Sequence, residues 1–413
     1  MATIHSGVLL GNVTITSSAF SGISFGDSLD VDAPVSEIVY NQAPDKHLMM
    51  TFGSGNIIFE SGTVSNETIT LANSTTVTQT VSTSYRNDER SFKGIYDPDT
   101  EQTIIAAYNG SNIDVMVANV SSDGNITVGS AVTVSDTFGY QIVDMIYDTN
   151  RNEVILFTYE SGNAIQAHVG TVSTNSISFG STITAYSLPD GFYDGAVAWD
   201  SANNQFLLYY KGYSNSYFYT KAVRGTSSGT SISLGTWYST NYLPGGSGVT
   251  HYGYRGSRLK CVGSNKFALV TVINNPYAGE GITGVIITTS GTNAPTVNTH
   301  SAINNYPGRP INDTIPEVAF DGTRLVVAYA GGTADTIQEH ALIAIGSIGS
   351  TSITWSDITP LVSTGSEHSE ETYDYYGAIA YDSTANRIVV TSERTTSGYH
   401  SAAIRTLIVA RVS

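Results

Sequence analysis

The chain has 413 residues and a formal net charge of −17, from 18 lysine and arginine against 35 aspartate and glutamate residues. This balance excludes nucleic acid and anionic membrane surfaces as expected partners, because both require clustered basic residues. Its single cysteine, Cys261, excludes an internal disulfide and any redox or metal motif built on paired cysteines. The sequence contains neither a secretory leader nor an apolar run long enough to span a bilayer, so we expect no signal peptide, no membrane insertion and folding in a reducing cytoplasm.

The composition is typical of an all-β protein. Glycine accounts for 40 residues and tyrosine for 26, and only 13% of the chain is charged. β-Branched and aromatic residues favour strands, whereas glycine, asparagine, aspartate and serine favour turns. A chain of this length would ordinarily form two or three domains, so internal repeats must be sought before domains are assigned.

One phrase recurs along the chain: a small residue, an apolar pair, an aromatic residue and an aspartate, then a polar turn and a second apolar run. Clear copies are GAVAWDSANNQFLLYY (195–210) and GAIAYDSTANRIVVTSE (377–393). The copies start near residues 37, 92, 142, 194, 257, 316 and 376. The residues that open the turns are Asn41, Asp97, Asp148, Asp200, Gly263, Asp321 and Asp382. Each copy predicts a strand, a tight turn and a second strand.

Two further phrases complete each unit. A third apolar run such as AIQAHVGTVS (164–173) is followed by a phrase such as SISFGSTITAYS (176–187). Each unit therefore predicts four short strands, and units of about 40–60 residues with four strands are typical of β-propeller blades. No proline-rich or charged linker interrupts the repeat, which favours one propeller over residues 1–413.

The two ends of the chain complement each other. The last unit stops after its third strand, and the missing phrase occurs as GISFGDSLDVDAPVS (22–36), before the first unit. We predict a seven-bladed ring in which residues 13–36 supply the outer strand of the last blade, which removes both exposed edges. A β-helix or an array of small sandwiches would not explain this match. Residues 1–12 are apolar enough to form an anchor or an extra edge strand.

The turn aspartates admit two interpretations. A ring of carboxylates can bind metal ions, but a residue repeated in nearly every blade is more simply a turn cap that accepts backbone N–H groups. The eight histidines show no zinc-type spacing, and no calcium loop, phosphate-binding loop or nucleophile motif occurs. We therefore expect no metal, no cofactor and no catalytic residue.

Acidic loops leave a glycosidase open as an alternative, since such an enzyme needs two carboxyl groups flanking the scissile bond. The simpler interpretation is solvated charge in an acidic protein. The loops that carry these residues precede inner strands and can face one end of the ring. The candidates are Asp88, Glu89, Asp190, Asp194, Glu367, Glu370, Glu371 and Asp374.

Tyrosines outside the expected strands are the stronger candidates for binding. The stretch 237–256, after the fourth unit, is longer and richer in tyrosine than its counterparts. Tyrosine presents an apolar ring with a hydroxyl tip, which suits sugars and protein partners. Alternation along strands would place many tyrosines in the core, so only those expected in loops are taken as candidates. They are Tyr238, Tyr242, Tyr252, Tyr254, Tyr277 and Tyr306.

The alternation of AYDSTANRIVV (380–390) with SISFGSTIT (176–184) resembles a repeat of structural proteins of marine bacteriophages, especially phages of cyanobacteria. The resemblance covers essentially the whole chain. It implies a virion component, such as a tail appendage, an adhesin or a decoration protein, and it implies no catalytic residue. RLKCVGSNKF (258–267) and the long stretch 237–256 depart from the pattern.

We therefore expect a non-enzymatic virion protein, made in the host cytoplasm, that serves host attachment or particle assembly. Its expected partners are other virion proteins and host-surface glycans, with a copy number set by virion symmetry. A polysaccharide-degrading hydrolase or lyase and an intracellular interaction scaffold are the two alternatives.

Overall fold

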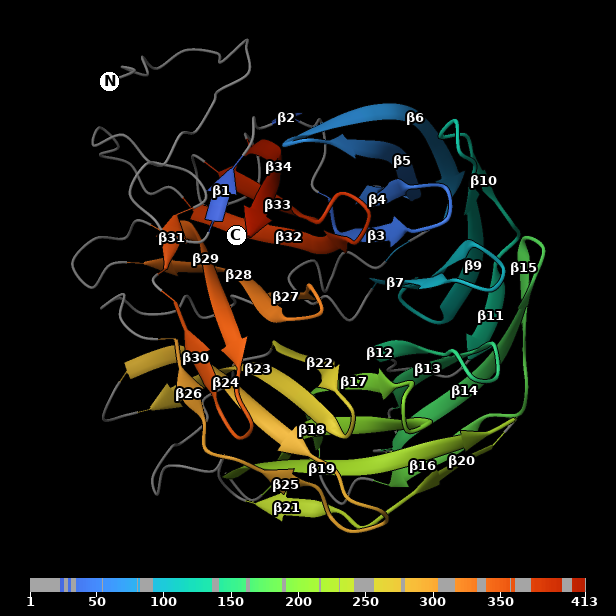
Figure 1. Ribbon diagram of the computed structural model, residues 1–413. Helices are drawn as coiled ribbons and strands as arrows, with labels where there is room; N and C mark the ends of the chain where they lie inside the picture. The colour runs from blue at the N-terminus through green and yellow to red at the C-terminus, as the bar shows by residue number, and fades with distance from the viewer. Residues whose placement is uncertain are drawn as a thin grey trace.

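The computed structural model describes a closed ring of seven sheets (Figure 1). The ranges described are 23–25, 29–30, 35–53, 55–79, 81, 92–135, 141–160, 164–187, 191–214, 217–229, 231–240, 256–275, 279–303, 316–332, 339–356, 358–360, 373–395 and 403–412. The prediction of an all-β, seven-bladed propeller is confirmed. Within these ranges, no helix is long and apolar enough to cross a membrane.

The blades are numbered here in chain order, each from its innermost strand outward. Blade 1 contains β3 (Glu37–Asn41), β4 (Lys46–Gly53), β5 (Asn56–Ser65) and β6 (Thr68–Thr78). Blade 2 contains β7 (Phe92–Asp97), β8 (Gln102–Tyr108), β9 (Ile113–Val120), β10 (Ile126–Val128) and β11 (Val132–Ser135). Blade 3 contains β12 (Gln141–Asp148), β13 (Glu153–Glu160), β14 (Ala164–Ser173), β15 (Ser176–Phe179) and β16 (Ile183–Ser187).

The remaining blades follow the same plan. Blade 4 contains β17 (Gly191–Asp200), β18 (Gln205–Ser214), β19 (Tyr217–Ser228), β20 (Ser231–Leu234) and β21 (Tyr238–Thr240). Blade 5 contains β22 (Ser257–Gly263), β23 (Lys266–Asn275), β24 (Gly279–Thr288), β25 (Thr296–Val297) and β26 (Ser301–Ala302). Blade 6 contains β27 (Glu317–Phe320), β28 (Arg324–Gly332), β29 (Glu339–Ile348), β30 (Ile353–Trp355) and β31 (Thr359–Pro360).

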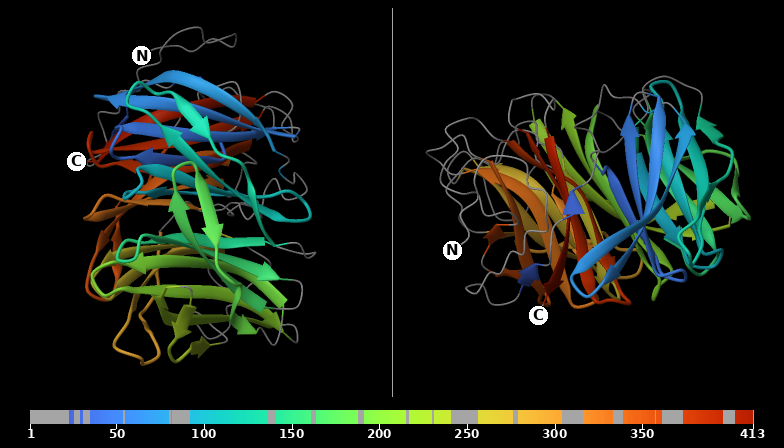
Figure 2. Two further views of the ribbon diagram at one scale, coloured as in Figure 1. Left: turned by 90° about the vertical axis from the view of Figure 1, so that its right-hand side faces the viewer. Right: turned by 90° about the horizontal axis from the view of Figure 1, so that it is seen from above.

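Blade 7 joins the two ends of the chain. Its strands β32 (Tyr373–Asp382), β33 (Arg387–Thr395) and β34 (Ala403–Val412) are completed by β1 (Ile23–Phe25) and β2 (Leu29–Asp30), which both pair antiparallel with β34. The predicted closure by an N-terminal strand is therefore confirmed, and residues 1–12 lie outside the described ranges. Figure 2 shows the ring from its edge in two views, each turned by 90° from the view of Figure 1.

In six of the seven sheets the outermost, fourth strand is divided into two short strands. In blade 2, for example, β10 and β11 both pair with β9, one after the other. The division falls at Gly129, whose N–H donates to the Val117 carbonyl at 2.8 Å. A Cβ added to Gly129 would lie 1.8 Å from the Asn175 carbonyl oxygen of blade 3. Glycine is therefore required here so that neighbouring blades can approach closely.

The core lies between the blades. Seven clusters of buried apolar residues each combine side chains of two adjacent blades. The cluster between blades 1 and 2, for example, joins Met50 and Phe59 to Ile105 and Met116. Because residues alternate in direction along a strand, each blade presents one apolar face to each neighbour. This packing explains why the apolar runs of the repeat are nearly continuous.

The aromatic–aspartate pair of the repeat holds the turn of its own blade and, in several blades, bonds a neighbouring blade. One carboxylate oxygen caps the blade's own turn, as when the Asp200 Oδ1 atom accepts the Ala202 N–H at 3.1 Å. Equivalent bonds from turn N–H groups end on the first oxygens of Asp97, Asp148, Asp321 and Asp382. The prediction of turn capping is therefore confirmed at these five aspartates.

In blades 3 and 4 the second carboxylate oxygen also bonds the following blade. Asp200 Oδ2 accepts the Asn265 N–H of blade 5 at 2.8 Å, and Asp148 Oδ2 accepts the Ser227 hydroxyl of blade 4. The preceding aromatic residue extends the other way, since the Tyr40 hydroxyl of blade 1 donates to Thr384 Oγ1 of blade 7 at 2.6 Å. In blade 3 one dipeptide holds three successive blades, because the Tyr147 hydroxyl donates to Asp99 of blade 2 and Asp148 accepts the Ser227 hydroxyl of blade 4.

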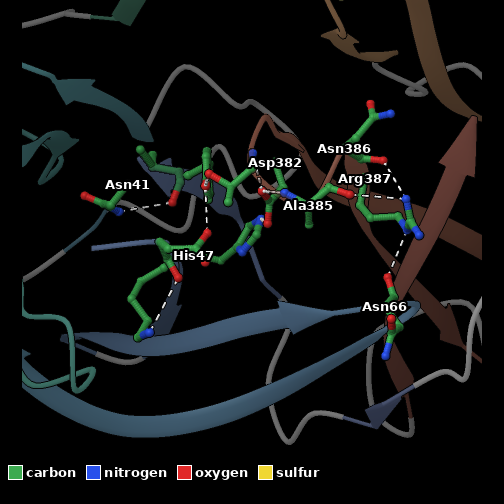
Figure 3. A network of polar contacts seen from close by, with 12 residues as sticks. Asn41, His47, Asn66, Asp382, Ala385, Asn386 and Arg387 are labelled. Atoms are coloured by element: carbon green, nitrogen blue, oxygen red, sulfur yellow. Dashed lines mark hydrogen bonds and ion pairs between the residues drawn. The ribbon is translucent and has the colours of Figure 1, made fainter. Parts of the chain in front are cut away.

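Polar residues of both blades lie at the junction between blades 7 and 1 (Figure 3). His47 of β4 is 0% exposed, and its Nε2 atom lies 3.8 Å from Asp382 Oδ2. Arg387 Nε donates to the Asn66 carbonyl across the same junction at 2.9 Å. Neither ring nitrogen of His47 has a hydrogen-bond partner, and burial lowers its pKa to about 3.

Candidate functional site

Charged side chains occupy equivalent positions on the innermost strands. The position four residues before the turn-opening residue holds Glu37 in β3, Lys93 in β7, Asp144 in β12 and Glu317 in β27. It holds Ala196 in blade 4 and Ala378 in blade 7. In blade 5 the strand β22 contains a register shift between Cys261 and Gly263, which exchanges the two faces of the strand. Arg258, which pairs with Val270, therefore takes the equivalent position instead of Leu259, and Lys260 lies two residues closer to the turn on the same face.

We call Glu37, Lys93, Asp144, Lys260 and Glu317, together with Arg258, the axial belt. The electrostatic interactions among them cross the ring: Glu317 of blade 6 raises the pKa of Lys93 in blade 2. Blades 2 and 6 are not neighbours, so these side chains can interact only if both face the axis (Figure 1). The belt holds three acidic and three basic residues, and its formal charge is zero in a protein of net charge −17.

Some belt members have direct partners. Arg258 binds Glu317 in bidentate fashion, with Nη2–Oε1 at 2.6 Å and Nε–Oε2 at 3.2 Å. Burial opposes ionisation of Glu317, but Arg258 outweighs this effect and lowers the pKa of Glu317. Asp144 accepts the Val197 N–H of blade 4 at 3.0 Å and its neighbour Met145 N–H at 2.9 Å, while burial raises its pKa. These groups are satisfied by the protein itself.

The other belt members have no hydrogen bond or ion pair within the described residues. They are Glu37, Lys93 and Lys260. Burial raises the pKa of Glu37 to about 7, against the opposing effect of Lys93. Burial acts to lower the pKa of Lys93, but Glu37 and Asp144 together outweigh it and raise that pKa. Burial also lowers the pKa of Lys260, and Asp144 offsets this only in part.

A second charged pair lies beside the belt. Asp194 of β17 is 4% exposed and its Oδ2 atom lies 3.8 Å from the Nζ atom of Lys211, which is 2% exposed. The Ser257 hydroxyl of blade 5 donates to the same Asp194 oxygen at 2.5 Å, and Lys211 Nζ donates to the Val272 carbonyl at 3.2 Å. Both groups therefore connect blade 4 to blade 5.

This placement corrects one expectation about the acidic candidates. Asp194 is a buried strand residue and not a solvated loop charge, because β17 begins before it at Gly191. Asp374 lies in β32. The other acidic candidates, Asp88, Glu89, Asp190, Glu367, Glu370 and Glu371, lie outside the described residues. No group of three or more histidine, cysteine or acidic residues arranged to hold a metal occurs in the part of the chain that the structure describes.

The structure describes one of the six tyrosine candidates. Tyr238 lies in β21 opposite Ala222 and packs against the apolar cluster between blades 4 and 5, so the expectation that it belongs to a loop is wrong. The physical reason is that the outer strand of blade 4 is divided and continues beyond the point where the repeated phrase breaks off. Tyr242, Tyr252, Tyr254, Tyr277 and Tyr306 lie outside the described residues, so their binding role stays a prediction.

The sequence analysis missed the axial belt. Four of its residues could have been found in the sequence. When the seven copies are aligned on their turn residues, Glu37, Lys93, Asp144 and Glu317 fall in one column. Arg258 could not have been found this way, because the register shift in β22 exists only in the folded sheet. These residues also come together only when the ring closes.

The comparisons with known proteins agree with this architecture. No protein-family model matches the sequence, and no curated protein matches it. A crystal structure of a protein from Lactobacillus plantarum superposes with a TM-score of 0.51 at 10% identity, over 78% of this chain and 84% of its own. The β-propeller domain of Vanderwaltozyma polyspora Nup133 gives 0.50 at 10% identity, over 98% and 100%. A chain of the mitotic checkpoint complex gives 0.50 at 10%, over 100% and 99%.

The chain shares its fold with these structures. At 10% identity the similarity concerns the propeller architecture alone and carries no activity, ligand or partner. The virion origin that the repeat suggests therefore stays a prediction.

Proposed function

We propose that this propeller is a non-enzymatic structural protein of a phage particle, a rigid disc that attaches to the host surface or to other virion proteins. The observation that carries the proposal is the continuous connection of the ring. Turn residues bond both neighbouring blades, and the two ends of the chain close the last blade. Such a scaffold holds its loops at fixed positions, which suits recognition of a repeated surface.

The engagement of Glu317 and Asp194 near the axis supports the same proposal over an enzyme, although Glu37 has no such partner within the described residues. A glycoside hydrolase needs two carboxyl groups free to act on opposite sides of a substrate bond. Glu317 is engaged by Arg258, and Asp194 by Ser257 and Lys211. These carboxylates form bonds between neighbouring blades of the ring. Together with the resemblance of the repeat to phage structural proteins, this favours binding or assembly.

The proposal has an active and a passive version. In the active version the loop tyrosines bind a host-surface glycan, and in the passive version the disc docks on other virion proteins. We would test binding of the labelled protein to a broad glycan array beside the double variant Tyr252→Ala/Tyr254→Ala. Specific binding that the variant loses would establish the active version. Binding to no sugar, with the protein present in purified particles by mass spectrometry, would establish the passive version.

Two results would contradict the proposal. Persistent absence of the protein from purified particles would favour an intracellular scaffold. Depolymerisation of host polysaccharide by the wild-type protein, lost in Glu370→Gln/Glu371→Gln, would favour the enzyme.

A further inference from the structure

We propose that residues 12–16 form a further β-strand, which pairs with the outer edge of β6 in blade 1 of the same chain. The site is a sheet edge at the rim of the ring (Figure 1). The inference does not rest on the proposed attachment role, because it concerns how the rim is covered and not what the loops bind. Three features support it: the sequence of the segment, the length of the edge and the position of β1.

The segment repeats a sequence that forms outer strands elsewhere in the chain. Residues 12–16 read NVTIT, and the start of β6 with the turn before it reads NETIT (66–70). Residues 11–15 likewise resemble GNITV (124–128), whose last three residues form β10. The outer position of every blade is already filled by described strands. The chain therefore contains one outer-strand phrase more than its seven blades can take.

β6 offers the longest edge among the outer strands that the structure describes. It spans 11 residues, whereas each of the others spans two to five residues. Of the described strands, only β5 pairs with β6, and its first part, Thr68–Leu71, pairs in regular register with residues 62–65. β6 contains no proline or charged residue that would keep another strand away. This edge can therefore accept an added strand through its backbone groups.

The start of β1 lies beside the start of β6. The Ser24 hydroxyl of β1 donates to Glu67 Oε1 at 3.3 Å, and Glu67 directly precedes β6. β1 and β6 hold the outermost position of neighbouring blades and run in similar directions, so a segment that turns back before Ile23 lies antiparallel to β6. Residues 17–22 can span about 20 Å, which exceeds the roughly 10 Å between packed sheets. Residues 12–16 can therefore reach this edge.

The apolar side chains of the segment match those of the edge. Ile69 is 6% exposed and belongs to the cluster between blades 7 and 1, against which the half-buried Leu71 also packs. Apolar and polar residues alternate in 12–16 as they do in Thr68–Leu71. Residues directly opposite each other in an antiparallel pair share a face. Val13 and Ile15 can therefore lie beside Ile69 and Leu71 and extend this apolar row.

Hydrogen–deuterium exchange with mass spectrometry tests the proposal on the full chain and on a variant that lacks residues 1–16. The N–H groups of an edge strand face outward at every second residue. We expect these amides of Thr68–Leu71 to exchange at least tenfold more slowly in the full chain than in the deletion variant. The outer strand β15 of blade 3 is the internal control, and its exchange should be the same in both proteins.

Two double variants separate strand pairing from other effects of the segment. Thr14→Pro/Ile15→Pro removes two successive N–H groups, one of which faces β6 in either register, so it should abolish the protection of Thr68–Leu71. Thr14→Ser/Ile15→Val is the matched control, because it keeps both N–H groups, and it should retain the protection. Circular dichroism and unchanged exchange of the inner strands show that each variant keeps its ring.

Dilution distinguishes a strand of the same chain from one donated by a second copy. Pairing within one chain is independent of concentration, so the protection of Thr68–Leu71 should persist on dilution. Protection that is lost on dilution, together with dimers by light scattering, would overturn the proposal. Equal exchange of Thr68–Leu71 in the full chain and the deletion variant would also overturn it. Neither result bears on the attachment role, which is tested on glycans and particles.

Discussion

At the scale of single residues, the repeated aspartate was interpreted correctly from its sequence context, because turn capping is a local property. An aspartate before a polar turn accepts N–H groups two residues on wherever such a turn forms. The bond from its second oxygen to the next blade was not predictable, because Asn265 lies 65 residues from Asp200. Asp194 shows the same limit: its sequence indicates a charged loop, but its partners Lys211 and Ser257 make it a buried strand residue.

The ion pair between Asp194 and Lys211 leads to a prediction at this scale. Lys211→Met removes the buried cation beside the Asp194 carboxylate, so we expect a loss of about 3–5 kcal/mol in the free energy of unfolding. The double variant Asp194→Asn/Lys211→Met removes both charges and should recover at least half of the loss. Denaturant unfolding of the two single variants and the double variant measures this coupling. Equal losses of unfolding free energy in Lys211→Met and in the double variant would show that the methionine, and not the buried charge of Asp194, is responsible.

At the scale of elements, the sequence predicted four strands per blade, and the structure divides the fourth strand in six blades. The glycine in ITVGS (126–130) marks the division, and its significance depends on a contact between blades. Side-chain alternation predicts which residues of a strand share a face, but it does not predict where two backbones approach so closely that a Cβ atom has no space.

Gly129→Ala is therefore expected to destabilise the outer edges of blades 2 and 3. The added Cβ would lie 1.8 Å from the Asn175 carbonyl oxygen, which cannot move aside as a flexible side chain would. Separation of the two edges should cost about 1–3 kcal/mol. Ser130→Ala is the control, because it changes the adjacent exposed residue and should alter stability by less than about 0.5 kcal/mol. Thermal unfolding measures the stability of both variants. A Gly129→Ala protein as stable as the wild type would contradict the close approach of blades 2 and 3.

At the scale of the whole molecule, the junction between blades 7 and 1 is where the ring closes and where a buried histidine lies. The folded-state pKa of His47 is about 3, below its ordinary value of 6.5, because burial disfavours the charged ring. A pKa lowered in the folded state contributes stability above pH 6.5, and that stability decreases as pH falls from 6.5 towards 3. Asp382 has the opposite effect, because burial raises its pKa.

His47→Leu should remove the acid sensitivity that His47 contributes. Relative to this variant, the wild type should lose at most about 1.4 kcal/mol per pH unit between pH 6.5 and 4. Thr384→Ala is the control: it removes the hydroxyl that accepts from Tyr40 across the same junction, and threonine does not titrate, so stability should fall by a similar amount at every pH in this range. Urea unfolding at several pH values checks this, and parallel profiles for wild type and His47→Leu would contradict it.

Closure itself is tested by truncation. Deletion of residues 1–12 should leave the ring intact, because the pairing with β34 begins at Ile23. Deletion of residues 1–35 removes β1 and β2 and exposes the edge of β34, so we expect unfolding or aggregation. Circular dichroism and size-exclusion chromatography distinguish these outcomes. A well-folded, monomeric product of residues 36–413 would show that closure is dispensable.

The sequence by itself determined the all-β class, the seven units, the turn caps and the closure by the N-terminal strand. These follow from alternation, turn chemistry and the match between the chain ends, which are properties of short segments and of their repetition. Only the tertiary structure decided the axial belt, because its residues are about 50 positions apart and meet when the ring closes. It also decided that Arg258 and not Leu259 takes the belt position in β22, since one register shift exchanges the two faces of that strand.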